Sequence, residues 1–248
     1  ENGVSIGRYP DGGPEFHRMA GLTLGSANGA RRLDDVVINE IMYDPISGES
    51  DEEFIELYNR SNGTVDLSGW RLRGGISYTF PDGVSIPSGG YVVVARNAVL
   101  LQANYAQLNA TNTFGDFSGK LGNGGDRVRL DKPDTVTDFT DPLNPIVSTI
   151  HIVVDDVSYQ TGGQWPVWAN GGGSSLERVD PRSNPRRPSA WADSDETSKA
   201  TWTNVSVTGL LELGTNSANA IDGGLQGAGE CLLDNVEVVS SSTNYVDN

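Results

Sequence analysis

The chain has 248 residues, with 33 acidic and 17 basic side chains, and its formal net charge at pH 7 is −16. A surface this acidic repels phosphate backbones and anionic lipid headgroups, which disfavours nucleic-acid and membrane-surface binding unless a local basic patch overrides it. The 31 glycines and the absence of helical periodicity favour an all-β, turn-rich class, and no apolar run is long enough to insert into a membrane.

Cys231 is the single cysteine, so an internal disulfide is excluded and no metal-ligand spacing is present. An acidic composition rich in Asn, Thr and Gly, with few lysines, is compatible with an extracellular or cell-surface bacterial protein that does not rely on disulfides. The sequence begins at Glu1 without a starting methionine or a signal sequence. We therefore expect a processed or excised piece of a longer protein.

Residues 1–33 open with a short predicted strand and a turn. The order of Ser5, Ile6 and Arg8 before a proline is echoed around Arg178 later in the chain. We therefore expect the trailing segment of a preceding, similar domain, or an added strand on this one. The stretch around Ser5 also matches the G-x-S-x-G nucleophile elbow, but the proline and glycines that follow prevent the helix that this chemistry needs. Catalysis by Ser5 is therefore disfavoured.

Short apolar runs, separated by Asp, Asn, Gly, Pro and Ser, dominate residues 34–194. The predicted strands are residues 36–42, 54–59, 69–73, 78–80, 91–95, 127–130, 150–159 and 174–179. Their spacing suits a β-sandwich. Residues 98–108 are the one helix candidate, and the prolines of residues 181–188 predict an extended connector at the domain edge.

Several motifs in this segment follow one another in a family-specific order. They include Ile38-Asn39-Glu40, Phe54-Ile55-Glu56-Leu57-Tyr58-Asn59, Asp66-Leu67-Ser68-Gly69-Trp70, Ile86-Pro87-Ser88-Gly89-Gly90 and Leu121-Gly122-Asn123-Gly124-Gly125-Asp126. This order resembles the lamin tail domain family over residues 34–194. The resemblance implies an all-β, immunoglobulin-like β-sandwich with extra flanking strands, known in lamins and in many secreted bacterial proteins. Function does not follow from the fold.

Residues 195–248 contain two further strand candidates, residues 202–208 and 230–239. The second candidate and the glycines before it resemble the strand that precedes a galactose-binding-like jelly roll. Two strands are too few for an independent sheet. We therefore expect a partial β segment that leads to a further domain.

Tryptophans gather in the C-terminal third, at Trp165, Trp168, Trp191 and Trp202. Exposed aromatic rings stack on sugar faces, so Trp165, Trp168 and Trp191 are candidates for a glycan-binding platform. The alternative is that these side chains pack between the sandwich and its flanking segments, given the apolar area of each ring.

Acidic loops offer hard oxygen ligands for calcium. The candidate ligands are Asp44, Glu49, Asp51, Asp131 and Asp134. None follows the EF-hand spacing, and such runs also occur as solvated faces. His17 and His151 are isolated and supply no metal cluster. No cofactor other than calcium is expected.

Glu40 and Glu56 lie inside predicted strands, where a carboxylate costs free energy unless it is exposed or paired. We expect them to face solvent or to cap neighbouring backbone rather than to catalyse a reaction. The sequence locates no other convergent polar groups, so an enzyme is not expected.

Two functions remain. The preferred one is a non-catalytic structural or adhesive module of a secreted or cell-surface multidomain protein. Its terminal strands could add to neighbouring domains or to copies of itself and build arrays or fibres. The alternative is a carbohydrate-binding accessory module of a larger extracellular enzyme, with a polysaccharide as its partner.

Overall fold

A computed structural model describes residues 5–32, 34–138, 140–141, 143–195, 204–208, 237–239 and 244–246. Its strands form two main sheets. The first contains, in spatial order, β1 (Ile6–Arg8), β2 (Phe16–Arg18), β13 (Ile146–Gln160), β12 (Gly125–Asp138), β6 (Arg71–Gly74), β7 (Ile76–Thr79) and β11 (Ser118–Gly119). The second contains β10 (Thr113–Phe114), β9 (Tyr91–Ala95), β4 (Phe54–Asn59), β3 (Val36–Met42), β14 (Leu176–Arg178) and β15 (Trp191–Asp193).

Short elements complete the chain. Two small ladders pair β5 (Val65–Asp66) with β8 (Ser85–Ile86) and β16 (Glu237–Val239) with β17 (Asn244–Val246). The helices are α1 (Ala98–Asn104) and the 3₁₀ turns η1 (Ser50–Glu52) and η2 (Pro188–Ala190). In the part of the chain described here, no helix has the length and apolar character needed to cross a membrane.

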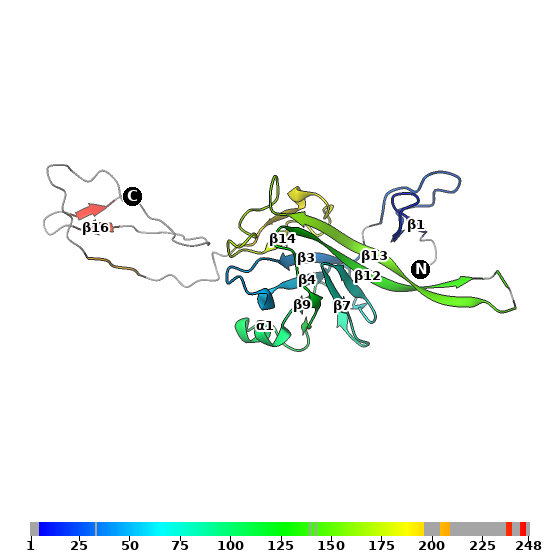
Figure 1. Cartoon of the computed structure of the whole chain (residues 1–248), viewed down its shortest axis with the longest axis horizontal. Coiled ribbons are helices and arrows are strands. Elements are labelled where there is room, and N and C mark those ends of the chain that lie inside the picture. The colour runs from blue at the N-terminus through cyan, green and yellow to red at the C-terminus, as the bar shows by residue number, and fades with distance from the viewer. Residues whose placement is uncertain are drawn as a thin grey trace.

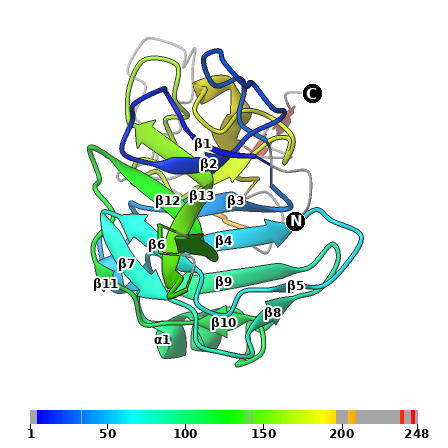
Figure 2. The same cartoon turned by 90° about the vertical axis from the view of Figure 1, so that its right-hand side faces the viewer.

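The two main sheets enclose one hydrophobic core. Alternation along β4 buries Ile55 and Leu57 completely, and these side chains share a cluster with Leu72, Val128 and Val157 of the other sheet. Each such side chain stabilises the fold by about 1.5–3 kcal/mol. Figure 2 shows β3, β4 and β9 side by side, with β12 and β13 crossing in front of them. The predicted β-sandwich is therefore confirmed.

Three strand predictions have the observed bounds, namely β3, β4 and β9. The predicted helix was too long, because α1 ends at Asn104 and Tyr105 has an extended conformation. Asn97 caps its first turn by accepting a hydrogen bond from the Leu100 amide at 3.0 Å. Leu101 is the buried contact of α1 with the second sheet.

Strands β12 and β13 are much longer than residues 127–130 and 150–159, which the sequence predicted. They continue as a two-stranded ribbon that projects from the right of the sandwich in Figure 1. We call residues 132–138 and 146–151 the β-arm. The sequence of residues 132–138 predicts a loop because it has no apolar face to bury in a core. In the structure, pairing with β13 provides partners for its backbone hydrogen-bonding groups.

The N-terminal segment joins the edge of the first sheet. Strands β1 and β2 form a hairpin, and β2 pairs in parallel with β13, with Phe16 opposite Ile152 and His17 opposite Val153. Residues 5–32 therefore add strands to this sandwich.

The extended connector predicted for residues 181–188 is wrong. The chain makes successive turns there, closed by amide-to-carbonyl bonds from Ser183 to Asp180 at 2.8 Å and from Arg187 to Asn184 at 3.2 Å. It then returns to the second sheet as β15, which pairs with β14. The Asp180 and Asn184 side chains accept bonds from nearby amides, and this local turn chemistry outweighs the proline signal.

The C-terminal predictions are covered in part. Residues 204–208 are exposed and form no strand, whereas Glu237–Val239 is a strand within the predicted 230–239 range. Trp202, Cys231 and most of the jelly-roll-like stretch lie outside the described residues.

Candidate functional site

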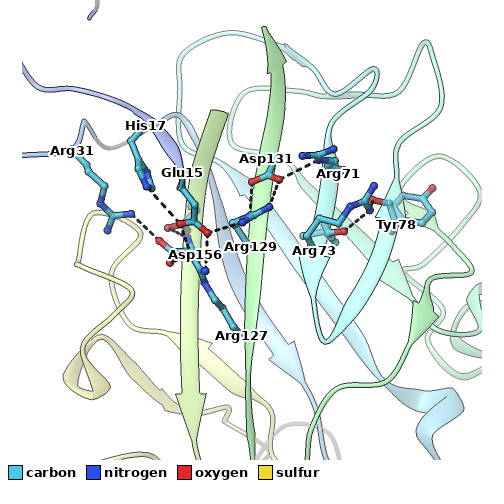
Figure 3. Close-up of polar contacts among 12 residues, drawn as sticks. Glu15, His17, Arg31, Arg71, Arg73, Tyr78, Arg127, Arg129, Asp131 and Asp156 are labelled. Carbon is cyan, nitrogen blue, oxygen red and sulfur yellow. Dashed lines mark hydrogen bonds and ion pairs between the residues drawn. The ribbon is translucent and has the colours of Figure 1, made fainter. Parts of the chain in front are cut away.

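Charged side chains cover the outer face of the first sheet. On β12, alternation places Arg127, Arg129 and Asp131 on this face, whereas Val128 and Leu130 enter the core. Strands β2, β6 and β13 and two nearby loops add further charges (Figure 3). We call this set the arginine row, and it consists of Glu15, His17, Arg31, Arg71, Arg73, Arg127, Arg129, Asp131, Asp156 and Arg186.

Glu15 links the N-terminal segment to β12. Its two carboxylate oxygens accept hydrogen bonds of 2.8 Å from Nη1 and Nη2 of Arg127, and Oε1 accepts a third, of 2.6 Å, from Arg129. These bonds, above all those from Arg127, lower the pKa of Glu15 despite its partial burial. Glu15 therefore remains ionised and holds residues 5–32 against the sheet.

Asp156 joins three segments that are distant in sequence. It accepts bonds from Arg31 at 2.8 Å, from Arg127 at 3.0 Å and from Arg186 at 2.6 Å. Burial acts to raise the pKa of Asp156, but the hydrogen bonds from Arg31 and Arg186 lower it overall. The carboxylate therefore fixes the N-terminal segment and the turns after β14 to the same sheet.

The β6 end of the arginine row has fewer carboxylates. The strand register places Arg71 opposite Asp131, and Nε of Arg71 lies 3.1 Å from Oδ2 of Asp131. It also places Arg73 opposite Arg129, so that two positive side chains face each other. Within the described residues Arg73 pairs with no carboxylate. Its guanidinium donates instead to neutral oxygens of Leu72, Ser77, Tyr78 and Thr79.

The arginine row carries a net positive charge. Its six arginines share three carboxylates, so three positive charges are in excess. His17 adds no charge near neutrality, because burial first and the nearby Arg31 second lower its pKa to about 4. In a chain of net charge −16, this face is therefore a local basic patch.

His151 lies at the base of the β-arm and is half-buried. Burial, followed by the positive charge of Arg71, lowers its pKa. Both histidines are therefore neutral at physiological pH. In the described part of the chain, no three His, Cys, Asp or Glu side chains converge as a metal site.

A second ionic contact lies inside the sandwich and ties its two sheets together. Arg178 donates to Oδ2 of Asp155 at 2.7 Å and to the Ile38 carbonyl at 3.2 Å. Oδ2 of Asp155 also accepts the Ile38 amide at 3.0 Å. The echoed residue Arg8 has another role, because its guanidinium lies 4.4 Å from the ring centre of Phe16.

The β-arm exposes apolar side chains and unpaired strand edges. Pairing of β12 with β6 ends at Asp131, and pairing of β13 with β2 begins at Ile152, so the described β-arm strands pair only with each other. Ile146 and Val147 are 66% and 64% exposed. Exposed apolar residues next to an unpaired edge are typical of strand-pairing surfaces.

Two of the three tryptophans predicted to form a glycan platform are buried. Trp165 and Trp191 are 7% and 4% exposed and belong to the core, and Trp191 also donates from Nε1 to the Pro185 carbonyl at 2.8 Å. Only Trp168 of the three, 44% exposed, offers a ring to solvent. The predicted alternative of packing holds for the two buried rings.

The calcium candidates lie in different surroundings. Asp131 is buried between Arg71 and Arg129, where two guanidinium groups already neutralise it. Asp51 pairs with Arg96 at 3.5 Å, and Asp44 accepts a hydrogen bond from Asn123. Glu49 is exposed beside η1 and Asp134 is half-buried in the β-arm. The five residues therefore form no common site.

Glu40 and Glu56 lie opposite each other on β3 and β4. Glu56 accepts a bond from Asn39 at 2.9 Å, and Ser175 donates to Glu40. Burial raises the pKa of Glu56 to about 7. The hydrogen bond from Asn39 acts against this rise, and the negative charge of Glu40 adds to it. Each of the two carboxyl groups thus accepts a hydrogen bond from a side chain. The Ser5 hydroxyl donates to the Gly21 carbonyl at 2.9 Å.

Comparison with known proteins finds a family match for part of the chain. Residues 30–143 match the family model described as Lamin Tail Domain. No curated protein matches the chain significantly. A solved structure of a DUF4876 family protein from Bacteroides thetaiotaomicron is 14% identical, with 75% of this chain and 77% of that chain covered and a TM-score of 0.39.

Proposed function

We propose that the chain is a non-catalytic structural or adhesive module of a secreted or cell-surface bacterial protein, and the match of residues 30–143 to the Lamin Tail Domain family model supports this proposal. The charged groups support this function, since their shortest contacts join separate segments of the chain to each other. Glu15, Asp155 and Asp156 each bond to arginines from other elements. Such contacts stabilise a scaffold.

The β-arm is the observation that carries the proposal. Its two edges differ in chemistry. The β12 edge contains Lys132, Pro133, Asp134 and Asp138, and charges and proline are the residues that proteins use to block strand pairing. The β13 edge, residues 146–150, is uncharged, lacks proline and is rich in β-branched residues. One edge is therefore protected and the other is open to a partner strand.

The partner that suits this edge is a second copy of the chain. Two copies of net charge −16 repel each other over most of their surfaces. Two β13 edges can meet in antiparallel orientation without opposing like charges, and backbone hydrogen bonds would then join the sheets. The N-terminal segment, which the sequence suggested as a donor strand, pairs with its own β13 instead.

Light scattering coupled to size-exclusion chromatography tests this association. The double variant Val147→Lys with Thr149→Lys places two charges on the open edge. The matched control Thr135→Lys with Thr137→Lys places them on the cross-strand partners of the same residues, on the other edge. The wild-type chain and the control should associate as concentration rises, and the β13 variant should stay monomeric. A wild-type chain that is monomeric at every concentration contradicts the association.

The carbohydrate-binding alternative retains one observation, the exposed ring of Trp168. A single ring is a small platform, so this function is secondary. Quenching of tryptophan fluorescence by neutral polysaccharides, lost in Trp168→Ala, would support it.

A further inference from the structure

At the β6 end of the arginine row, Arg73 carries a positive charge that no carboxylate of the described residues neutralises. Elsewhere in the row each carboxylate lies between two or more arginines, as Glu15 does between Arg127 and Arg129. At the β6 end, Arg73 faces Arg129 directly across the ladder. Like charges directly opposite each other in a sheet are unfavourable, so this end would gain from a bound anion.

The guanidinium of Arg73 is held in one orientation. Its Nη1 donates at 2.9 Å to the Leu72 carbonyl, at 2.8 Å to the Ser77 hydroxyl and at 3.1 Å to the Tyr78 carbonyl. Its Nη2 lies 3.3 Å from the Thr79 hydroxyl oxygen. These acceptors are neutral and leave the positive charge in place. A preorganised guanidinium loses little conformational entropy when it binds a ligand.

Arg71 completes the pair on the same outer face. Arg71 and Arg73 are two residues apart on β6 and therefore point to the same side of the sheet, as Figure 3 shows. The Nε of Arg71 pairs with Asp131, and 26% of the Arg71 side chain remains exposed. Exposed Ser77 and Thr79 on β7 lie beside the two arginines.

We propose that Arg71 and Arg73 bind an oxyanion group, sulfate or carboxylate, carried by an acidic polysaccharide. Arginine forks match the paired oxygens of both groups. The hydroxyls of Ser77 and Thr79 suit the hydroxyls of a sugar chain. The site lies on an exposed sheet face, so a polymer that meets the basic patch at several points suits it better than a free ion. This site lies on the sheet face and does not depend on the open edge of the β-arm.

Isothermal titration of the full chain with dextran sulfate and with polygalacturonate tests the site, and uncharged dextran is the reference ligand. Arg73→Gln should weaken binding of the acidic polymer by roughly tenfold or more, the usual effect of removing a charged hydrogen-bond donor. The control Arg182→Gln removes the same charge from an exposed turn residue outside the arginine row and should change affinity by about twofold or less.

Three results would overturn the proposal. The first is the absence of binding to either acidic polysaccharide at low salt. The second is an equal loss of affinity in Arg73→Gln and Arg182→Gln, which would indicate that binding depends on the net charge of the protein and not on the site. The third is tighter binding of poly-glutamate or duplex DNA than of both polysaccharides, which would assign the face to another class of partner. Stronger binding of dextran sulfate than of polygalacturonate, or the reverse, identifies which oxyanion the site prefers.

Discussion

Removal of the buried Arg178 charge should destabilise the sandwich severely. The side chain of Arg178 is completely buried and that of Asp155 is 6% exposed, and their 2.7 Å contact joins β14 to β13. In Arg178→Met the Asp155 carboxylate stays buried without its counter-charge, and the Ile38 carbonyl loses a donor. Breaking such a pair costs about 3–5 kcal/mol. For a domain of this size, that loss lowers the Tm by roughly 6–20 °C.

Urea unfolding followed by tryptophan fluorescence measures this loss. The double variant Asp155→Asn with Arg178→Met removes both charges and should recover a large part of the stability, since neutral replacements of buried ion pairs are often tolerated. If Arg178→Met changes the free energy of unfolding by less than about 0.5 kcal/mol, a typical surface effect, the pair does not hold the sheets together and the reasoning fails.

Three further predictions concern stability and the N-terminal segment. The raised pKa of Glu56 means that the folded state keeps the Glu56 proton at pH values where the unfolded chain has lost it. The free energy of unfolding of the wild-type chain should therefore fall by on the order of 2–3 kcal/mol as pH rises from 4.5 to about 7. Urea unfolding curves measured over this pH range should show no such fall in Glu56→Gln. Glu15→Gln should accelerate amide exchange in residues 16–18, because it weakens two arginine contacts, and unchanged exchange would show that β2 pairing alone holds the segment. Trp191→Ala should cost about 3–5 kcal/mol in the same assay and Trp168→Ala less than about 1 kcal/mol; equal losses would refute the assignment of core and surface rings.

The family motifs and strand alternation predicted the sandwich, because local pattern and burial agree in β3, β4 and β9. The β-arm was missed, since residues 132–138 are stabilised by a partner strand and not by a core. Sequence alone cannot show which polar segment finds such a partner. The family match ends at residue 143, yet β13, β14 and β15 belong to the same sandwich.

The arginine row was also missed, although part of its signal is visible in the sequence. Arg71 and Arg73, like Arg127 and Arg129, are separated by one residue inside predicted strands, and such pairs share one face. Their partners Glu15 and Asp156 come from distant segments and depend on topology. Asp131 illustrates the consequence: read as a loop acid it suggested calcium, but the sheet places it between arginines. The burial of Trp165 and Trp191 could not be predicted either, since it depends on which distant segments pack against each ring.

Amide hydrogen exchange at increasing protein concentration tests the central claim most directly, because it reports on each edge of the β-arm separately. If the module associates through the open edge, amides within residues 146–150 should become protected as concentration rises, and those of residues 134–138 should not change. Exchange that is independent of concentration on both edges, or equal protection of both, would contradict the account.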